Sequence, residues 1–334
     1  MKSRWFGIVA TFSRRLLLVL FFPFSMCPAD PLPAALQTVA VLSSLDQTSE
    51  PVWFLPNPLP HPEPLLVHLH SWSSRFNQSA GVAALAQECE RRGWSFLSPN
   101  FRGSNDNPLA CASPQAIQDV LDAVNFAIRS TIVDPRRIYL LGGSGGGHMA
   151  LTMAHSSPGV WAAVSAWVPI TDLAAWHAFS KSKGSRYHRM LESVCGGVPE
   201  DPAATVEYRL RSPLFHLSSA AGLPIDIQAG INDGHGSAQV PVDHSLRAFS
   251  ELAAANGVED KALTSAEIEF ITREARLPPG LKSDPFGESG RLRAVLFRRT
   301  AGPVRLTLFD GAHETDFSAA VRWLETQRSR PPLE

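Results

Sequence analysis

Short apolar runs alternate with longer segments of helical period along most of this chain. The apolar runs have the length of buried β-strands, and the segments between them are long enough to form helices. The predicted strands cover residues 65–69, 95–99, 138–141, 162–167, 225–229 and 304–309. The predicted helices cover residues 79–91, 114–128, 146–155, 242–255 and 317–326. This alternation predicts an α/β fold, with a mostly parallel sheet and helices on both of its faces.

Size and charge narrow the class of protein. The chain has 334 residues, of which 44% are hydrophobic and 18% charged, which fits one large globular domain or at most two small ones. Its 30 basic and 31 acidic residues give a net charge of −1, and no long block of like charge occurs. We therefore expect no nucleic-acid partner, and a small or neutral substrate instead.

Residues 1–29 have the composition of a secretory signal peptide. Basic side chains, among them Arg14 and Arg15, precede an apolar run at 16–24, and residues 27–29 offer a cleavage position. The run is too short to span a bilayer comfortably, so no membrane span is expected after its removal. We expect an exported protein, periplasmic or secreted. The paired arginines leave both the general secretory and the twin-arginine route open.

Three segments depart from the simple alternation. Residues 30–64 form a Pro-rich N-terminal segment, and the six prolines between Pro51 and Pro64 predict an extended or turn-rich chain before the main domain at 65–330. Insertions are predicted near residues 171–217, as a lid, and near 257–302. In the second insertion, Thr264 and Glu267 have the spacing of a helix capping box, and residues 294–299 resemble an extra strand.

A glycine-rich turn carries the main chemical signal. Ser144 lies between glycine pairs in the run 142–146, directly after a predicted strand and before a predicted helix. A nucleophile at such a sharp turn needs neighbours without side chains, and the helix N-terminus favours negative charge. The alternative of a phosphate-binding loop lacks the lysine and the glycine spacing that it requires. Ser144 is therefore the predicted nucleophile.

A serine nucleophile needs a base, and the base needs an orienting carboxylate. Asp233 and His313 each follow the carboxyl end of a predicted strand, which is where open parallel sheets place their functional residues. Asp226 and Asp243 are rival acids, but the first begins a strand and the second lies within a helix. We predict Asp233 as the acid and His313 as the base.

Backbone amides are expected to stabilise the oxyanion of the reaction. Gly145 supplies one at the helix N-terminus, and Ser71 or Trp72 supplies the second from the loop after strand 65–69. Trp72, Trp167 and Trp176 are predicted to line the substrate pocket, with core packing as the alternative for each.

Metal binding and disulfides are weakly indicated. His68 and His70 form an HxH pair on one strand face, but no further ligands follow, so we expect no metal and no cofactor. Cys89, Cys111 and Cys195 remain after signal removal, and both free thiols and one disulfide stay open.

The sequence resembles the catalytic domain of prolyl oligopeptidase-like serine hydrolases, which have the α/β-hydrolase fold. The resemblance covers residues 65–326 and implies that Ser144, Asp233 and His313 are nucleophile, acid and base. The residues that carry it are 98–104, 119–120, 142–147, 211–216, 230–233 with 240–245, and 311–314. Because residues 30–65 are too few for the family's β-propeller, a propeller-free form is expected.

The predicted function is hydrolysis of an ester or peptide bond through an acyl-enzyme. A carbohydrate-ester esterase, acetyl or feruloyl, acting on a glycan ester is the alternative to a peptidase, since exposed tryptophans suit sugar stacking. A non-catalytic binding protein of the same fold is the remote alternative.

Overall fold

The computed structural model describes residues 32–78, 80–236 and 239–329, and the predicted signal peptide lies outside them. Its sheet has nine strands in the order β1-β2-β4-β3-β5-β6-β7-β9-β8. The strands are β1 Gln37–Leu42, β2 Ser49–Leu55, β3 Glu63–Leu69, β4 Ser95–Pro99, β5 Val133–Gly143, β6 Ala163–Trp167, β7 Ile225–Gly230, β8 Val295–Ala301 and β9 Val304–Phe309. All pairings from β4 through β9 are parallel, and β1, β2 and β8 join antiparallel at the two edges. The predicted mostly parallel sheet is confirmed.

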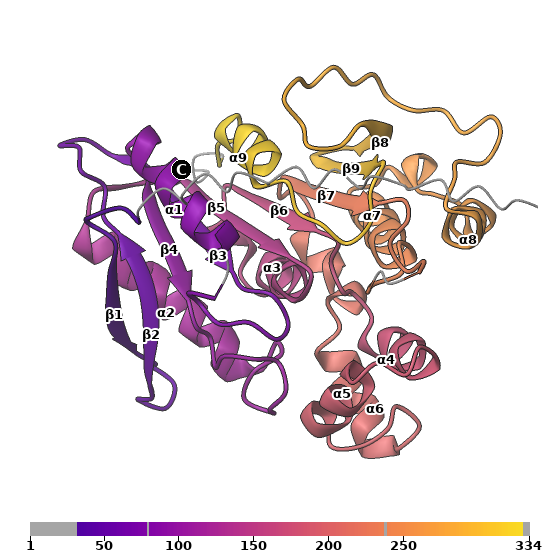
Figure 1. The fold of residues 1–334 in the computed structure, drawn as a ribbon, viewed down its shortest axis with the longest axis horizontal. Coiled ribbons are helices and arrows are strands. Elements are labelled where there is room, and N and C mark those ends of the chain that lie inside the picture. The colour runs from indigo at the N-terminus through magenta and orange to yellow at the C-terminus, as the bar shows by residue number, and fades with distance from the viewer. Residues whose placement is uncertain (1–31, 79, 237–238, 330–334) are drawn as a thin grey trace, which may run out of the picture. The chain divides into compact units, whose positions relative to one another are not determined.

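Helices cover both faces of this sheet (Figure 1). One face packs against α2, α3 and α7, and the opposite face against α1 and α9, so two apolar cores form. The helices are α1 Ala80–Arg92, α2 Pro114–Ser130, α3 Gly145–Ser156, α4 Leu173–Ser182, α5 Tyr187–Cys195, α6 Pro202–Leu210, α7 Asp243–Ala255, α8 Ser265–Glu274 and α9 Phe317–Glu325. Strands buried on both faces explain the continuous apolar runs of the sequence.

The Pro-rich segment corrects one prediction. The sheet begins at β1 and not at residue 65, because β1 pairs with β2 and β2 pairs with β4. Pro51 lies within β2, and its carbonyl accepts a hydrogen bond from the Asn100 amide at 3.1 Å. Val52 and Phe54 alternate into the core. This period-two pattern outweighs the missing N–H donor of one proline.

The two stretches predicted as insertions have their own local structure. Within 171–217, helices α4, α5 and α6 pack around Trp176 and Tyr208 as a third apolar cluster, and they lie together beside the sheet in Figure 1. Within 257–302, the capping box of Thr264 and Glu267 is confirmed at the start of α8. The extra strand is also confirmed, since β8 pairs antiparallel with β9.

Candidate active site

Ser144 lies at the turn between β5 and α3 in a strained backbone conformation, with φ 59° and ψ −120°. Its amide donates to the Trp167 carbonyl at 2.9 Å, which ties the turn to β6. A Cβ at Gly142 would lie 2.1 Å from the Gly146 carbonyl oxygen, and one at Gly146 would lie 2.1 Å from the Leu69 oxygen. Only glycine fits at these positions, so the sequence around Ser144 is what this tight turn requires.

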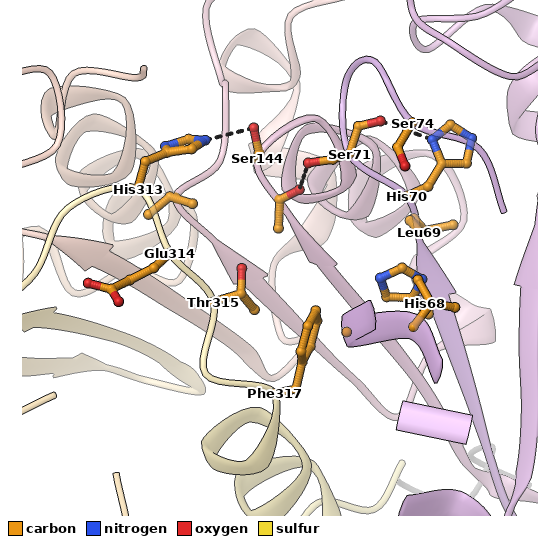
Figure 2. Close-up of a pocket in the computed structure, with 14 residues that line it drawn as sticks. His68, Leu69, His70, Ser71, Ser74, Ser144, His313, Glu314, Thr315 and Phe317 are labelled. Atoms are coloured by element: carbon orange, nitrogen blue, oxygen red, sulfur yellow. Dashed lines mark hydrogen bonds between the residues drawn. The ribbon is translucent and has the colours of Figure 1, made fainter. Parts of the chain in front are cut away.

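Ser144, His313 and Asp233 form a continuous hydrogen-bonded series. His313 Nε2 lies 2.8 Å from Ser144 Oγ (Figure 2), and His313 Nδ1 lies 2.7 Å from Asp233 Oδ2. The other carboxylate oxygen of Asp233 accepts from the amides of Gly234 at 3.0 Å and Val240 at 3.1 Å. Asp233 is buried, so these bonds hold it in one orientation. A serine whose proton faces an oriented imidazole can be deprotonated during attack on a carbonyl.

The rival acids lie elsewhere. Asp226 is buried on β7 and forms an ion pair with Arg305 at 2.7 Å. Asp243 begins α7 and faces Arg247 at 4.0 Å.

The backbone of Trp72 lies against Gly145, the residue that follows Ser144. A Cβ at Gly145 would lie 2.4 Å from the Trp72 nitrogen, so these two positions are in direct contact. Within the described part of the chain, neither amide donates to another backbone group. Gly145 is the first residue of α3, where the N–H has no partner in the helix. The side chain of Ser71 donates to the Gly143 carbonyl at 3.4 Å, and its backbone amide stays a predicted alternative to that of Trp72.

A cavity of about 260 Å³ opens at Ser144. Figure 2 shows His313, Ser71 and Phe317 around it. Its lining residues are His68, Leu69, His70, Ser71, Ser74, Gly81, Val82, Gly143, Ser144, Val168, His313, Glu314, Thr315 and Phe317. Sequence reasoning missed Ser74, Thr315 and Phe317 as lining residues. Thr315 and Phe317 lie two and four residues after His313, and this closeness along the chain is the one signal that could have indicated them.

The lining carries little free charge. Burial lowers the pKa of His68 to about 3, and burial also lowers the pKa of His70, so both imidazoles are neutral near pH 7. Glu314 is engaged by Arg293, whose Nε lies 3.0 Å and 3.1 Å from its two oxygens. The cavity therefore suits an uncharged group.

The three tryptophans predicted for the pocket occupy other places. Trp72, Trp167 and Trp176 are each at most 2% exposed, and none lines the cavity at Ser144. Trp72 packs edge-on against Trp176 at 4.7 Å between ring centres. Trp167 packs against Phe309. The pocket prediction is corrected to the alternative of core packing, because large apolar rings gain most from full burial.

The remaining polar candidates also have structural partners. His68 Nδ1 lies 3.4 Å from Ser98 Oγ, and His70 Nε2 lies 2.8 Å from the Asn100 carbonyl. Within the described residues, no group of three or more His, Cys, Asp or Glu side chains is placed to hold a metal. Cys89, Cys111 and Cys195 are all buried free thiols.

Arg102 holds the turn after β4. Its guanidinium contacts Asp119 at 2.6 Å and both carboxylate oxygens of Asp46 at 2.9 Å. Phe101 and Arg102 both have positive φ values, 32° and 73°. The ion pairs stabilise this strained turn, which directly follows Asn100, whose carbonyl contacts His70 Nε2.

Comparison with known proteins gives one consistent result. The sequence model of the prolyl oligopeptidase family matches residues 84–267. Acylamino-acid-releasing enzyme 1 of Oryza sativa subsp. japonica is 24% identical over 225 residues, which are 61% of this chain and 27% of that protein. Dipeptidyl aminopeptidase BIII of Pseudoxanthomonas mexicana is 33% identical over 110 residues, 31% of this chain and 16% of that one. The chain thus spans about a quarter or less of the length of these relatives.

Solved structures share the fold. The acylaminoacyl peptidase of Pyrococcus horikoshii superposes with a TM-score of 0.54 at 19% identity, covering 66% of this chain and 35% of the other. A puromycin hydrolase gives 0.55 at 19% identity, covering 68% and 35%. These similarities confirm the α/β-hydrolase fold. No helix among the described residues is long and apolar enough to cross a membrane.

Proposed function

The chain belongs to the prolyl oligopeptidase family, a family of serine hydrolases, and we propose that it cleaves peptide bonds with Ser144 as nucleophile. The single observation that carries this proposal is the hydrogen-bonded series from Ser144 through His313 to Asp233, with distances of 2.8 Å and 2.7 Å. This is the arrangement that acyl transfer to a serine requires.

The mechanism follows from these contacts. His313 Nε2 accepts the Ser144 hydroxyl proton as Oγ attacks the carbonyl carbon, and Asp233 keeps the imidazole in the tautomer that leaves Nε2 unprotonated beforehand. The amides of Gly145 and Trp72 stabilise the oxyanion. His313 then gives the proton to the leaving amine, and an acyl-enzyme remains on Ser144. Water, deprotonated by His313, releases the acyl product and restores the serine.

The cavity favours an uncharged acyl group. The positively charged amino terminus of a peptide would need a carboxylate in the cavity that has no other partner. Glu314, the carboxylate that lines the cavity, already pairs with Arg293. We therefore propose short peptides with a blocked amino terminus as substrates, in agreement with the acylamino-acid-releasing relatives.

The esterase alternative loses its main support. Sugar stacking needs exposed aromatic rings, whereas Trp72, Trp167 and Trp176 are buried. A glycan ester remains a substrate to be tested against the peptide, because the same acyl-enzyme chemistry cleaves both.

Substrate comparison tests the proposal. We expect higher kcat/KM on N-acetyl-aminoacyl anilides than on the same anilides with a free amine or on acetylated and feruloylated sugars. Preference for sugar esters would overturn the peptidase assignment. Ser144→Ala should abolish turnover and labelling by a fluorophosphonate, while Ser193→Ala, on the exposed face of α5, should retain both. Failure of the unaltered protein to react with the probe would identify a non-catalytic protein.

Export is a separate proposal that rests on residues 1–29 alone. Expression in a bacterial host, followed by fractionation and N-terminal sequencing, tests it. We expect a mature chain beginning near residue 30 in the periplasm or medium. An uncleaved chain in the cytoplasm would contradict export.

A further inference from the structure

Charged side chains replace the apolar core at one end of the sheet. On the face covered by α9, neighbouring strands β7, β9 and β8 present Asp226, Arg305 and Arg298. The opposite face of β7 and β9 carries buried apolar residues such as Ile227 and Leu306. The connection between α8 and β8 passes over this end of the sheet (Figure 1) and contributes Glu288 and Arg291.

Glu288 accepts hydrogen bonds from three arginines. Its carboxylate accepts from Arg291 at 2.8 Å, from Arg298 at 2.7 Å and from Arg305 at 2.8 Å. Burial raises the pKa of Glu288, but the hydrogen bonds from Arg298 and Arg291 and the charge of Arg305 outweigh burial and lower it to about 2. Glu288 is therefore ionised at neutral pH, and the three guanidinium groups lie around one carboxylate.

The cluster has more positive than negative charge. Three arginines face two carboxylates, Glu288 and Asp226, which leaves one positive charge unbalanced. Arg291, Arg298 and Arg305 are only 5%, 8% and 13% exposed in their side chains. A buried charge without a counter-charge is costly, so this arrangement indicates a missing anionic partner.

Unpaired donors point to the same conclusion. Nine buried side-chain nitrogen or oxygen atoms among the described residues lack a hydrogen-bond partner, and three belong to this cluster: Arg291 Nε, Arg298 Nη2 and Arg305 Nη2. Most buried donors in folded proteins are satisfied. Three guanidinium groups that share the Glu288 carboxylate therefore each have one donor without an acceptor, which indicates that an anionic acceptor is missing from the cluster.

A cavity of about 440 Å³ adjoins the cluster. Arg305 and Arg322 line it together with Glu288, Ser289 and Trp323, whereas Arg291 and Arg298 do not. Arg322 adds a second unbalanced positive charge at the cavity wall, since its one hydrogen-bond partner among the described residues is the carbonyl of Gly290 at 3.1 Å. We propose that this cavity binds a small oxyanion of the phosphate type, with Arg305 and Arg322 as donors. Arg298 lies behind them in the cluster, where it binds Glu288.

Phosphate-type anions suit these groups for two reasons. Guanidinium groups donate well-oriented hydrogen bonds to phosphate and sulfate oxygens, and a dianion balances the two unpaired charges. The Trp323 ring in the cavity wall could contact the organic part of a phosphomonoester. Both a phosphomonoester and inorganic phosphate are therefore candidate sources of the oxyanion.

Binding is expected to stabilise the segment that holds the His313 loop. The Leu292 amide donates to Asp316 Oδ2 at 2.8 Å, and Arg293 pairs with Glu314. These contacts follow directly after Glu288 and Arg291 along the chain. The site is separate from the cavity at Ser144, so the inference does not depend on the proposed peptidase activity.

Thermal unfolding and calorimetric titration of the full chain test the site. Sodium phosphate should raise Tm in a saturable manner, and sodium chloride at equal ionic strength should not. Comparing inorganic phosphate with glycerol 3-phosphate distinguishes the two sources of the anion by their relative Kd. If phosphate raises Tm no more than chloride does, the site does not exist.

Two variants make the test specific. Arg322→Gln removes a proposed donor that holds no carboxylate and should weaken phosphate binding about tenfold or more. Ser289→Asp supplies a carboxylate at the cavity wall, so it should raise Tm without phosphate and abolish the phosphate effect. Ser219→Asp, exposed on the 3-10 turn Leu217–Ala220 that packs against α3 and α7, is the matched control and should retain the effect. Equal phosphate responses in the two aspartate variants would overturn the proposal.

Discussion

Gly145 and the backbone of Trp72 are packed so closely that a Cβ at position 145 would lie 2.4 Å from the Trp72 nitrogen. Trp72 cannot move away freely, because its carbonyl accepts from the Asn105 amide at 2.8 Å and its indole packs against Trp176. The backbones of the two residues proposed to stabilise the oxyanion are thus held against each other by the same packing that buries the indole.

Gly145→Ala should therefore separate these amides. We expect kcat to fall about 100-fold or more, the effect of losing one oxyanion donor, with a smaller change in KM. Steady-state kinetics on an N-acetyl-aminoacyl anilide measures it. Gly159→Ala is the matched control, since a Cβ there meets nothing within 4 Å, and it should retain full activity. Unchanged kcat in Gly145→Ala would remove Gly145 from the oxyanion site.

Asp316 connects the start of α9 to the loop that carries His313. One of its oxygens accepts from the Ala319 amide at 2.9 Å as a helix cap, and the other accepts from Leu292 at 2.8 Å. Asp316→Ala should lower the free energy of unfolding by about 1–3 kcal/mol and also lower kcat several-fold, because His313 is three residues away.

Thr264→Ala provides the comparison for Asp316. Thr264 caps α8 at an exposed position that has no contact with the site. Its loss should cost about 1 kcal/mol in urea denaturation while kcat stays unchanged. If both cap variants leave kcat unchanged, Asp316 has no role in positioning the His313 loop.

The ion pair between Arg102 and Asp119 is buried, with side chains 4% and 1% exposed. Arg102→Leu leaves Asp119 without a counter-charge and should lower the free energy of unfolding by about 3–5 kcal/mol. Arg273→Leu is the control, because its pair with Glu269 is exposed on α8 and should contribute less than about 1 kcal/mol. Equal losses in urea denaturation would contradict a stabilising role for the buried pair.

Secondary-structure elements and tight turns could be predicted from the sequence where the local residue pattern determines them. Strand and helix periods located the strands β3 to β7 and β9 and the helices α1, α2, α3, α7 and α9, and the glycines around Ser144 identified the turn. They did not locate α4, α5 and α6, which lie within the predicted insertion at 171–217. The sequence did not reveal β1 and β2, because the prolines near Pro51 obscured a period-two pattern that only the pairing with β4 makes stable.

Side-chain environments depend on contacts between distant segments. Trp167 and Trp176 lie in the sequence beside and within the insertion at 171–217, which suggested a place in the substrate pocket. In the fold both side chains are buried in the core. The arginine cluster around Glu288 likewise joins three strands and an irregular connection, and no periodicity in the chain indicates that Arg298 and Arg305 face one carboxylate.

His148 is expected to make the fold sensitive to acid. It is fully buried on α3, its Nδ1–H donates to the Ile170 carbonyl at 3.1 Å, and burial lowers its pKa to about 4. The unfolded chain, with an ordinary pKa near 6.5, binds a proton more readily between these values. Stability from the neutral imidazole is therefore complete above about pH 6.5 and is lost as the pH falls toward 4, by about 3 kcal/mol. In urea denaturation from pH 7 to 4, His148→Gln should reduce this loss, whereas His61→Gln, at an exposed position, should not. An unchanged pH dependence in His148→Gln would show that other groups determine the acid sensitivity.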